Sequence, residues 1–177
     1  MRQPGDAWPS LARSSVFIME DGRVVLATGN RVRLTQLASV SVNADGDGEF
    51  ALNGADGTWQ LSDTIRLGAA WAESTGDFWG VRDVRGETAP NWSAFAGRYG
   101  ASPDGTGVEI GRSGSIRGTI AGCIVSGQAG SDMAVSLTLT SCSQAGSYMA
   151  VLDIPANDNE LPSLLIAGQG TGWRLAQ

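Results

Sequence analysis

Hydrophobic and polar residues alternate along most of this 177-residue chain with a period of two, the spacing of a β-strand rather than of a helix. Residues 16–27, VFIMEDGRVVLA, form two apolar runs joined by Asp21-Gly22. Asp-Gly between β-rich runs is a strong hairpin signal, because both residues tolerate a positive φ. The pattern predicts two antiparallel strands with a tight turn at this dipeptide.

The same alternation continues in the second half. In residues 133–140, MAVSLTLT, apolar residues alternate with Ala, Ser and Thr, as one buried and one wetter face would. Tyr148, Ala150, Leu152 and Ile154 alternate in the same way, which predicts another strand with one wet face.

Short apolar runs separated by turn residues at spacings of about 8–12 positions are typical of a sandwich or barrel. We therefore predict an all-β fold, an antiparallel β-barrel or barrel-like sandwich of about 8–12 short strands with little helix. A barrel is favoured because closure removes exposed strand edges. Short helical turns are expected near Asn91–Phe95 and near Asn157–Leu161.

The domain organisation follows from a polar stretch in the middle of the chain. Residues 1–14 are interpreted as an N-terminal extension and residues 15–177 as a single β-barrel domain. That domain is either one continuous unit or two halves, 15–82 and 95–177, joined by residues 83–94.

Composition narrows the possible functions. Gly accounts for 25 residues, about twice the usual share of roughly 7%, as expected for a protein with many turns. The formal charge is −6, and no basic cluster is available to neutralise phosphates, so nucleic acid is not an expected partner. The sequence contains no run of about 18 apolar residues, so it predicts no membrane span.

All basic residues are Arg, and the chain contains no His. It therefore lacks a side chain that titrates unperturbed near neutral pH, the commonest metal ligand and a Schiff-base amine. These absences predict a protein that is not an enzyme and needs no cofactor.

The stretch NADGDGEF resembles the start of a calcium-binding loop. Asn43, Asp45 and Asp47 fall at positions 1, 3 and 5, a glycine follows at position 6, and Glu49 would offer its carbonyl at position 7. Position 12, where a bidentate carboxylate is needed, is Gly54. Calcium is thus one hypothesis, at affinities of about a millimolar. A hairpin turn built from the same Asp and Gly residues is the other.

Cys123 and Cys142 lie in consecutive strand-like segments. If the register places them opposite each other, they can form a disulfide, which suits an envelope or secreted protein. The alternative is a pair of buried, unbonded thiols. Two thiols without His do not predict a metal site.

An acidic and aromatic grouping lies in residues 71–83. Trp71, Phe78 and Trp79 are candidates for a ligand or partner surface, and Glu73, Asp77 and Asp83 flank them. Such groupings also occur in glycoside-active sites, which need two carboxyl groups, although strand-end acids beside core aromatics look the same in sequence. Trp8, Trp92 and Trp173 lie near element ends, as lids on the core or an interaction surface would.

The segment from Phe95 to Leu175 resembles a β-barrel domain of small bacterial envelope proteins, of the periplasmic and lipoprotein type. The matching motifs are AGRYGAS (96–102), GSIRGTIAGCIVSGQ (114–128) and MAVSLTLTSCSQAGSYMAVL (133–152), in that order. The first half of the chain has no counterpart. The resemblance implies an envelope location, a barrel of eight or more strands, and binding rather than catalysis. Some proteins of this group act as immunity or inhibitor partners of secreted toxins.

Three functional hypotheses follow. The first is a non-enzymatic envelope binding protein with a protein partner such as a secreted toxin or a cell-wall hydrolase. The second is a lipocalin-like barrel that holds a small apolar ligand. The third is a glycan hydrolase that uses acidic residues. The N-terminal residues lack the apolar core of a secretory signal, so we expect either a mature periplasmic or envelope chain or a cytoplasmic protein.

Overall fold

The computed structural model describes residues 14–19, 21–42, 47–53, 60–66, 72–73, 79–80, 90–100, 105–132, 134–155, 159–168 and 170–177. The strands of this part of the chain are β1 (Ser14–Ile18), β2 (Arg23–Thr28), β3 (Arg31–Val42), β4 (Asp47–Asn53), β5 (Gln60–Arg66), β6 (Ala72–Glu73), β7 (Trp79–Gly80), β8 (Gly97–Tyr99), β9 (Gly107–Ile110), β10 (Ser115–Ile120), β11 (Cys123–Gln128), β12 (Ala134–Thr140), β13 (Gly146–Asp153), β14 (Ser163–Ala167) and β15 (Gly172–Ala176). The predicted all-β, antiparallel barrel architecture is confirmed.

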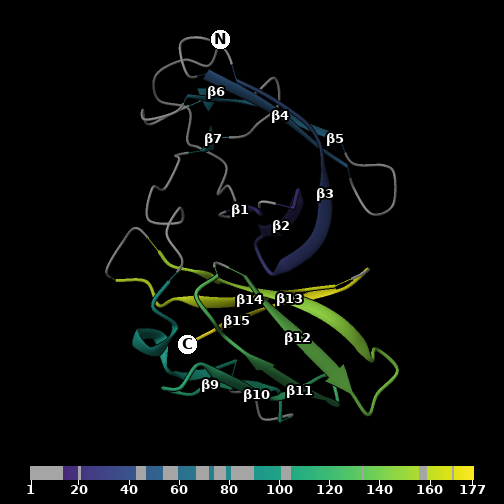
Figure 1. The fold of residues 1–177 in the computed structure, drawn as a ribbon, viewed down its shortest axis with the longest axis vertical. Helices are drawn as coiled ribbons and strands as arrows, with labels where there is room; N and C mark the ends of the chain where they lie inside the picture. Colours follow the sequence, from purple (N-terminus) through teal and green to yellow (C-terminus); the bar gives the residue numbers. More distant parts are fainter. Residues whose placement is uncertain are drawn as a thin grey trace, which may run out of the picture.

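The C-terminal half forms the barrel, in the lower part of Figure 1. Its eight strands, β8 to β15, are hydrogen-bonded in chain order, each antiparallel to the next, which makes an up-and-down meander. The two outer strands approach each other where the backbone N–H of Gly100 donates to the carbonyl of Ala176 at 2.7 Å. The barrel is therefore nearly closed.

The inward positions of these strands fill the barrel with one hydrophobic cluster. Ile116, Ile120, Leu137, Leu164 and Ile166 are among its fully buried members. An eight-stranded barrel has an interior just wide enough to be filled by side chains. The strict alternation predicted for residues 133–140 is confirmed in β12, where Val135, Leu137 and Leu139 are buried and the intervening residues are exposed or half-buried.

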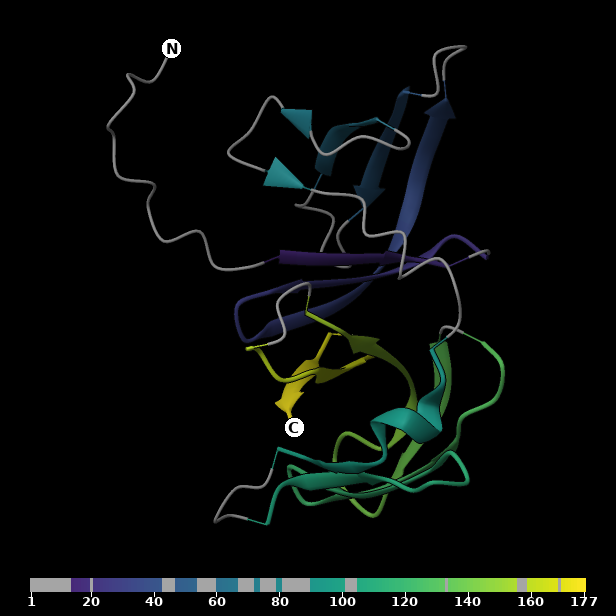
Figure 2. The ribbon, with the colours of Figure 1, turned by 90° about the vertical axis from the view of Figure 1, so that its left-hand side faces the viewer.

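Strands β13 and β14 differ from β12 because both of their faces are buried. The prediction of a wet face beside Tyr148 and Ala150 is wrong: Met149 and Val151, which point the other way, are 3% and 0% exposed. They form a second cluster with Leu165 and residues of β2 and β3. The N-terminal sheet thus covers the outer face of β13 and β14, and Figure 2 shows the purple strands of this sheet above the yellow strands of the barrel.

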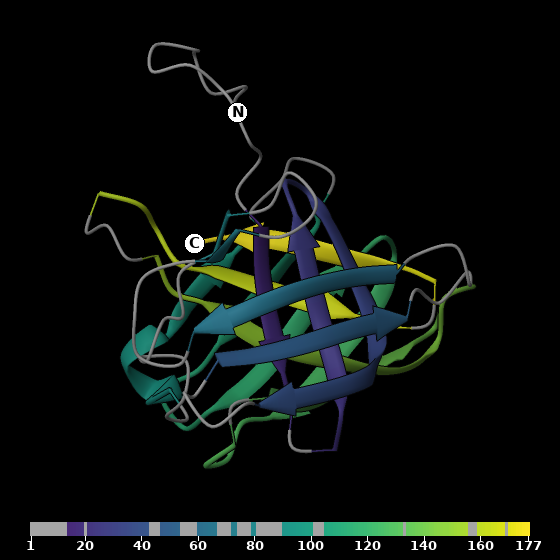
Figure 3. The ribbon, with the colours of Figure 1, turned by 90° about the horizontal axis from the view of Figure 1, so that it is seen from above.

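The N-terminal sheet has the order β1-β2-β3-β4-β5. The hairpin predicted between β1 and β2 is confirmed, although its turn is longer than a two-residue one: the N–H of Gly22 donates to the carbonyl of Met19, and Gly22 has φ +79°. Strand β3 shifts register between Leu37 and Ser39. Because a bulge of this kind bends a strand, β3 passes from the layer on the barrel to the layer of β4 and β5, which cross β1 and β2 in Figure 3.

A buried ion pair lies between the two sheets. Asp153 at the end of β13 accepts a bond from the Arg174 guanidinium at 2.6 Å and another from the Ser15 hydroxyl at 3.0 Å. The side chains of Asp153 and Arg174 are 7% and 15% exposed. This cluster joins β1, β13 and β15 with polar contacts beside the apolar cluster.

A short 3₁₀ helix, η2 (Trp92–Phe95), covers one end of the barrel. It confirms the helical turn predicted near Asn91–Phe95, whereas the turn predicted near Asn157–Leu161 falls partly outside the described residues. Trp92 is 3% exposed, belongs to the barrel core, and donates its indole N–H to the carbonyl of Asp132 at 3.1 Å. Of the two uses considered for this residue, a lid on the core or an interaction surface, its burial fits the first. Trp8 lies outside the described residues.

Candidate functional site at the disulfide end of the barrel

The end of the barrel opposite η2 is closed by a disulfide between Cys123 and Cys142, which confirms the predicted pairing. Cys123 opens β11, and Cys142 lies in the loop 141–145 that joins β12 to β13. The Cα atoms are 4.9 Å apart, and the bridge spans 19 positions of sequence. Among the described residues there is no free cysteine. We call this end, with loop 141–145, the turn at 121–122 and the described residues Gly168 and Thr171 between β14 and β15, the disulfide end.

The backbone of Ser141 places Cys142 for this bond. The ladder between β11 and β12 runs as far as Ile124 opposite Thr140, so a regular continuation would place Ser141, not Cys142, opposite Cys123. Ser141 instead has φ +64°, in the left-handed region that non-glycine residues rarely adopt. The strand ends there and turns Cys142 onto the inner side, against the barrel core.

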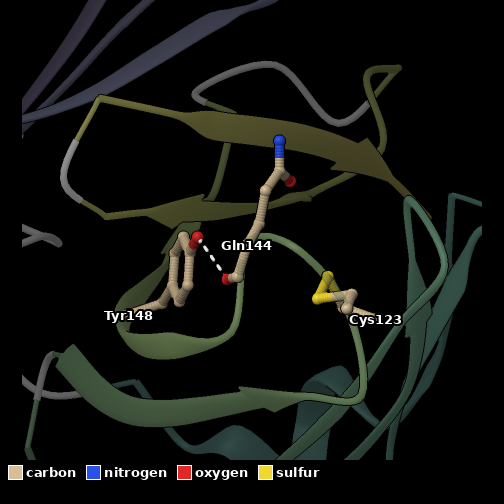
Figure 4. Close-up of a disulfide and its surroundings, with 4 residues drawn as sticks. Cys123, Gln144 and Tyr148 are labelled. Atoms are coloured by element: carbon tan, nitrogen blue, oxygen red, sulfur yellow. Dashed lines mark hydrogen bonds between the residues drawn. A yellow bond between two sulfur atoms is a disulfide. The ribbon is translucent and has the colours of Figure 1, made fainter.

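Tyr148 connects loop 141–145 to the rest of this end. Its hydroxyl donates to the backbone carbonyl of Gln144 at 2.9 Å, and Figure 4 shows this bond beside the disulfide. Its ring lies 5.5 Å from the half-buried ring of Trp173, at a tilt of 45°. Gly168 lies directly under the Tyr148 ring, where a Cβ atom would overlap it. One phenol thus contacts the loop, the β14–β15 turn and a second aromatic residue.

The outer face next to the disulfide carries polar residues around one exposed apolar side chain. Ile124, the second residue of β11, is 53% exposed. Thr119 and Thr140 lie directly across from it on the neighbouring strands, and both are exposed. The next row along the strands consists of exposed Arg117, Ser126 and Thr138. This surface, which we call the Ile124 face, lies on paired strands and is therefore held rigidly.

The predicted calcium ligands fall at the turn between β3 and β4. The hairpin itself is formed, with Val42 opposite Gly48. Asn43 and Asp45 lie outside the described residues, and the backbone of Asp47 and Glu49 belongs to β4. Within the described part of the chain, His, Cys, Asp and Glu form no group of three or more that could hold a metal ion. Calcium binding stays a prediction.

Only Glu73 and Trp79 of the predicted acidic and aromatic grouping lie among the described residues. Glu73 and Trp79 are directly paired on the two-stranded ladder of β6 and β7. Trp71, Asp77, Phe78 and Asp83 lie outside the described residues. Both uses of this grouping, as a partner surface and as a hydrolase site, stay predictions.

Sequence reasoning missed Ile124, Ser141 and the bond from Tyr148. Ile124 could have been found from the alternation of β11, since Cys123 and Val125 must face inward if Cys123 is bridged inside the barrel. Nothing in the sequence marks Ser141 as left-handed, because Ser is not a residue favoured for that conformation.

Within the described residues, no helix has the length and hydropathy needed to cross a membrane. The disulfide is compatible with an extracytoplasmic location. No protein-family model, curated protein or solved structure matches the chain.

Proposed function

We propose that this protein is a non-enzymatic binding protein of the bacterial envelope and that it recognises a protein partner through the Ile124 face. The observation that carries the proposal is Ile124 itself, a large apolar side chain 53% exposed on an interior strand of a rigid sheet. An apolar residue surrounded by hydroxyl and guanidinium groups has the composition of a small interface core with a polar rim.

The location in the envelope is supported by the disulfide, since such bonds persist in oxidising compartments and are rare in the cytoplasm. The resemblance of residues 95–175 to envelope barrel proteins points to the same compartment. From that resemblance we take the partner to be a secreted toxin or a cell-wall hydrolase.

A binding role agrees with the chemistry that the chain offers. The sequence has no His and no Lys, so the hydroxyls of the Ile124 face have no common side-chain base to activate them. Thr119, Thr140 and Ser126 can instead offer contact area and hydrogen bonds to a binding partner.

Affinity capture with two matched variants tests the proposal. Ile124→Glu places a charge at the centre of the Ile124 face. Leu161→Glu makes the same change at the other large apolar residue that is exposed in the described part of the chain, 65% exposed in the loop before β14 at the opposite end of the barrel. Each purified protein is immobilised and exposed to an envelope extract of the source bacterium.

We expect the wild type and Leu161→Glu to retain one protein at stoichiometric yield, and Ile124→Glu to retain at least about tenfold less, as when a central contact residue is lost. Equal capture by all three proteins, or no capture by the wild type, would contradict the proposal. Native mass spectrometry of the gently purified wild type separates it from the lipocalin-like alternative, because a bound small apolar ligand adds mass without a partner.

A further inference from the structure

The two sulfur atoms of the disulfide lie in different environments. Cys123 is 0% exposed, on an inward position of β11 in the barrel core. Cys142 is only partly buried, and its loop neighbours Ser141, Ser143, Gln144 and Ala145 are all exposed. Of the two bonded residues, only Cys142 has surface exposed to solvent, so we expect a thiol arriving from solvent to attack there.

The loop that carries Cys142 has few other attachments. The ladder between β12 and β13 ends at Leu139 opposite Gly146. Beyond it, loop 141–145 is held by the disulfide, by the turn bond from Ala145 N–H to the Cys142 carbonyl at 3.3 Å, by the bond from Tyr148, and by the packing of Cys142 against the barrel core. The left-handed backbone at Ser141 opposes the loop conformation rather than supporting it.

From these observations we propose that Cys142 is a thiol-exchange site, at which a small thiol or a dithiol protein opens the bridge and releases loop 141–145. The proposal does not depend on the partner proposed above.

The reaction balances as a disulfide exchange. A thiolate attacks Sγ of Cys142, a new S–S bond forms there, and the electron pair of the Cys142–Cys123 bond leaves on Sγ of Cys123, which takes up a proton. A second thiol then attacks the sulfur of the attached reagent, which leaves as an oxidised disulfide and returns Cys142 as a free thiol. The net change is two thiols oxidised and one protein disulfide reduced.

Burial of Cys123 affects the rate as well as the site of attack. An apolar surrounding disfavours the departing thiolate, so opening is slower than for an exposed disulfide. The same burial keeps the released Cys123 thiol away from reagents in solution. We therefore expect the disulfide to open only under sustained exposure to reductant. The mixed disulfide with the attacking thiol is expected on Cys142.

Trapping in the wild-type protein tests the site of attack. The oxidised protein is incubated with limiting glutathione, quenched with acid, then denatured and alkylated with excess iodoacetamide at neutral pH, and mapped by peptide mass spectrometry. We expect glutathione on Cys142 and the alkyl group on Cys123. Glutathione on Cys123, or equal amounts on both residues, would overturn the proposal.

Two single variants provide a matched comparison. Cys123→Ser leaves the thiol of Cys142, and Cys142→Ser leaves the thiol of Cys123. We expect the Cys142 thiol to react with Ellman's reagent at least about tenfold faster in the native state, and the two thiols to react alike in denaturant, because access alone separates them. Equal native rates, with both variants folded by circular dichroism, would overturn the proposal.

Hydrogen exchange tests the release of the loop. We expect amide exchange in residues 141–148 to rise at least about tenfold when the wild type is reduced, while exchange in β10 stays unchanged. Unchanged exchange in residues 141–148 of the fully reduced protein would show that the loop is not held by the disulfide and would overturn that part of the proposal.

Discussion

Removing the cross-link between Cys123 and Cys142 is the perturbation whose effect can be worked out most directly. The bridge closes a segment with a sequence separation of 19. In the chain-entropy relation this separation lowers the entropy of the unfolded chain by about 11 cal/mol/K, which is about 3 kcal/mol at 25 °C. We therefore expect the free energy of unfolding to fall by about 3 kcal/mol when the bond is broken.

Urea unfolding followed by circular dichroism measures this difference. Oxidised and fully reduced wild type are compared first, because reduction breaks the bond without removing a buried atom. The variant Cys123→Ala/Cys142→Ser is compared next, and it should lose somewhat more, since Cys123 is fully buried and Ala leaves a small cavity. For a chain of this size, about 3 kcal/mol corresponds to a fall in Tm of about 6–12 °C.

The double variant also serves as the control, because its stability must not respond to reductant. A difference of less than about 1 kcal/mol between oxidised and reduced wild type would refute the reasoning. It would mean that the reduced, unfolded chain already keeps residues 123 and 142 close together.

Four further changes test other parts of the structure. Gly172→Ala should lower the free energy of unfolding by about 1–3 kcal/mol in urea, because its Cβ would overlap the β3 backbone and lie 2.8 Å from the Ile166 carbonyl oxygen; unchanged stability would contradict this close approach of the sheets. Ala121→Asn should raise the free energy of unfolding by about 0.5–1 kcal/mol, since Ala121 (φ +49°) and the glycine after it both adopt the positive φ of a hairpin turn that favours Asn-Gly. Asp153→Ala should cost about 3 kcal/mol or more by leaving the buried guanidinium beside it without this partner, and a loss below about 1 kcal/mol would show that the pair is solvated. Burial raises the pKa of Tyr99 to about 12, above the value of about 10 in an unfolded chain, so its contribution to stability is complete below about pH 10 and is lost as the pH rises through about 12; the Tyr99→Phe variant should lack this component in alkaline unfolding curves.

The all-β barrel could be predicted from the sequence because a strand with one buried and one exposed face alternates apolar and polar residues. In β12 every second side chain is buried and those between are exposed or half-buried, so the sequence itself alternates with a period of two. In β13 and β14 both faces are covered, so the runs YMAVL and LLIA are continuously apolar. A continuous apolar run is the pattern of a strand buried on both faces. The prediction that Tyr148 and Ala150 belong to a strand with one exposed face therefore did not foresee that the N-terminal sheet packs on the other face.

The candidate site was predictable only in part, for a different physical reason. Two cysteines on neighbouring strands suggested a bond, but sequence spacing does not fix register, and the pairing depends on the left-handed backbone at Ser141. Likewise, the exposure of Ile124 follows from which face of β11 lines the barrel, and that depends on the closure of all eight strands.

The two-faced strands β13 and β14 have a consequence for how the molecule comes apart. Each contributes side chains to the interior of the barrel and, with Met149, Val151 and Leu165, to the contact with the N-terminal sheet. Separating that sheet from the barrel would expose these apolar side chains to water, so we expect the two parts to unfold together. Heating should melt both sheets in one calorimetric peak whose van't Hoff and calorimetric enthalpies agree.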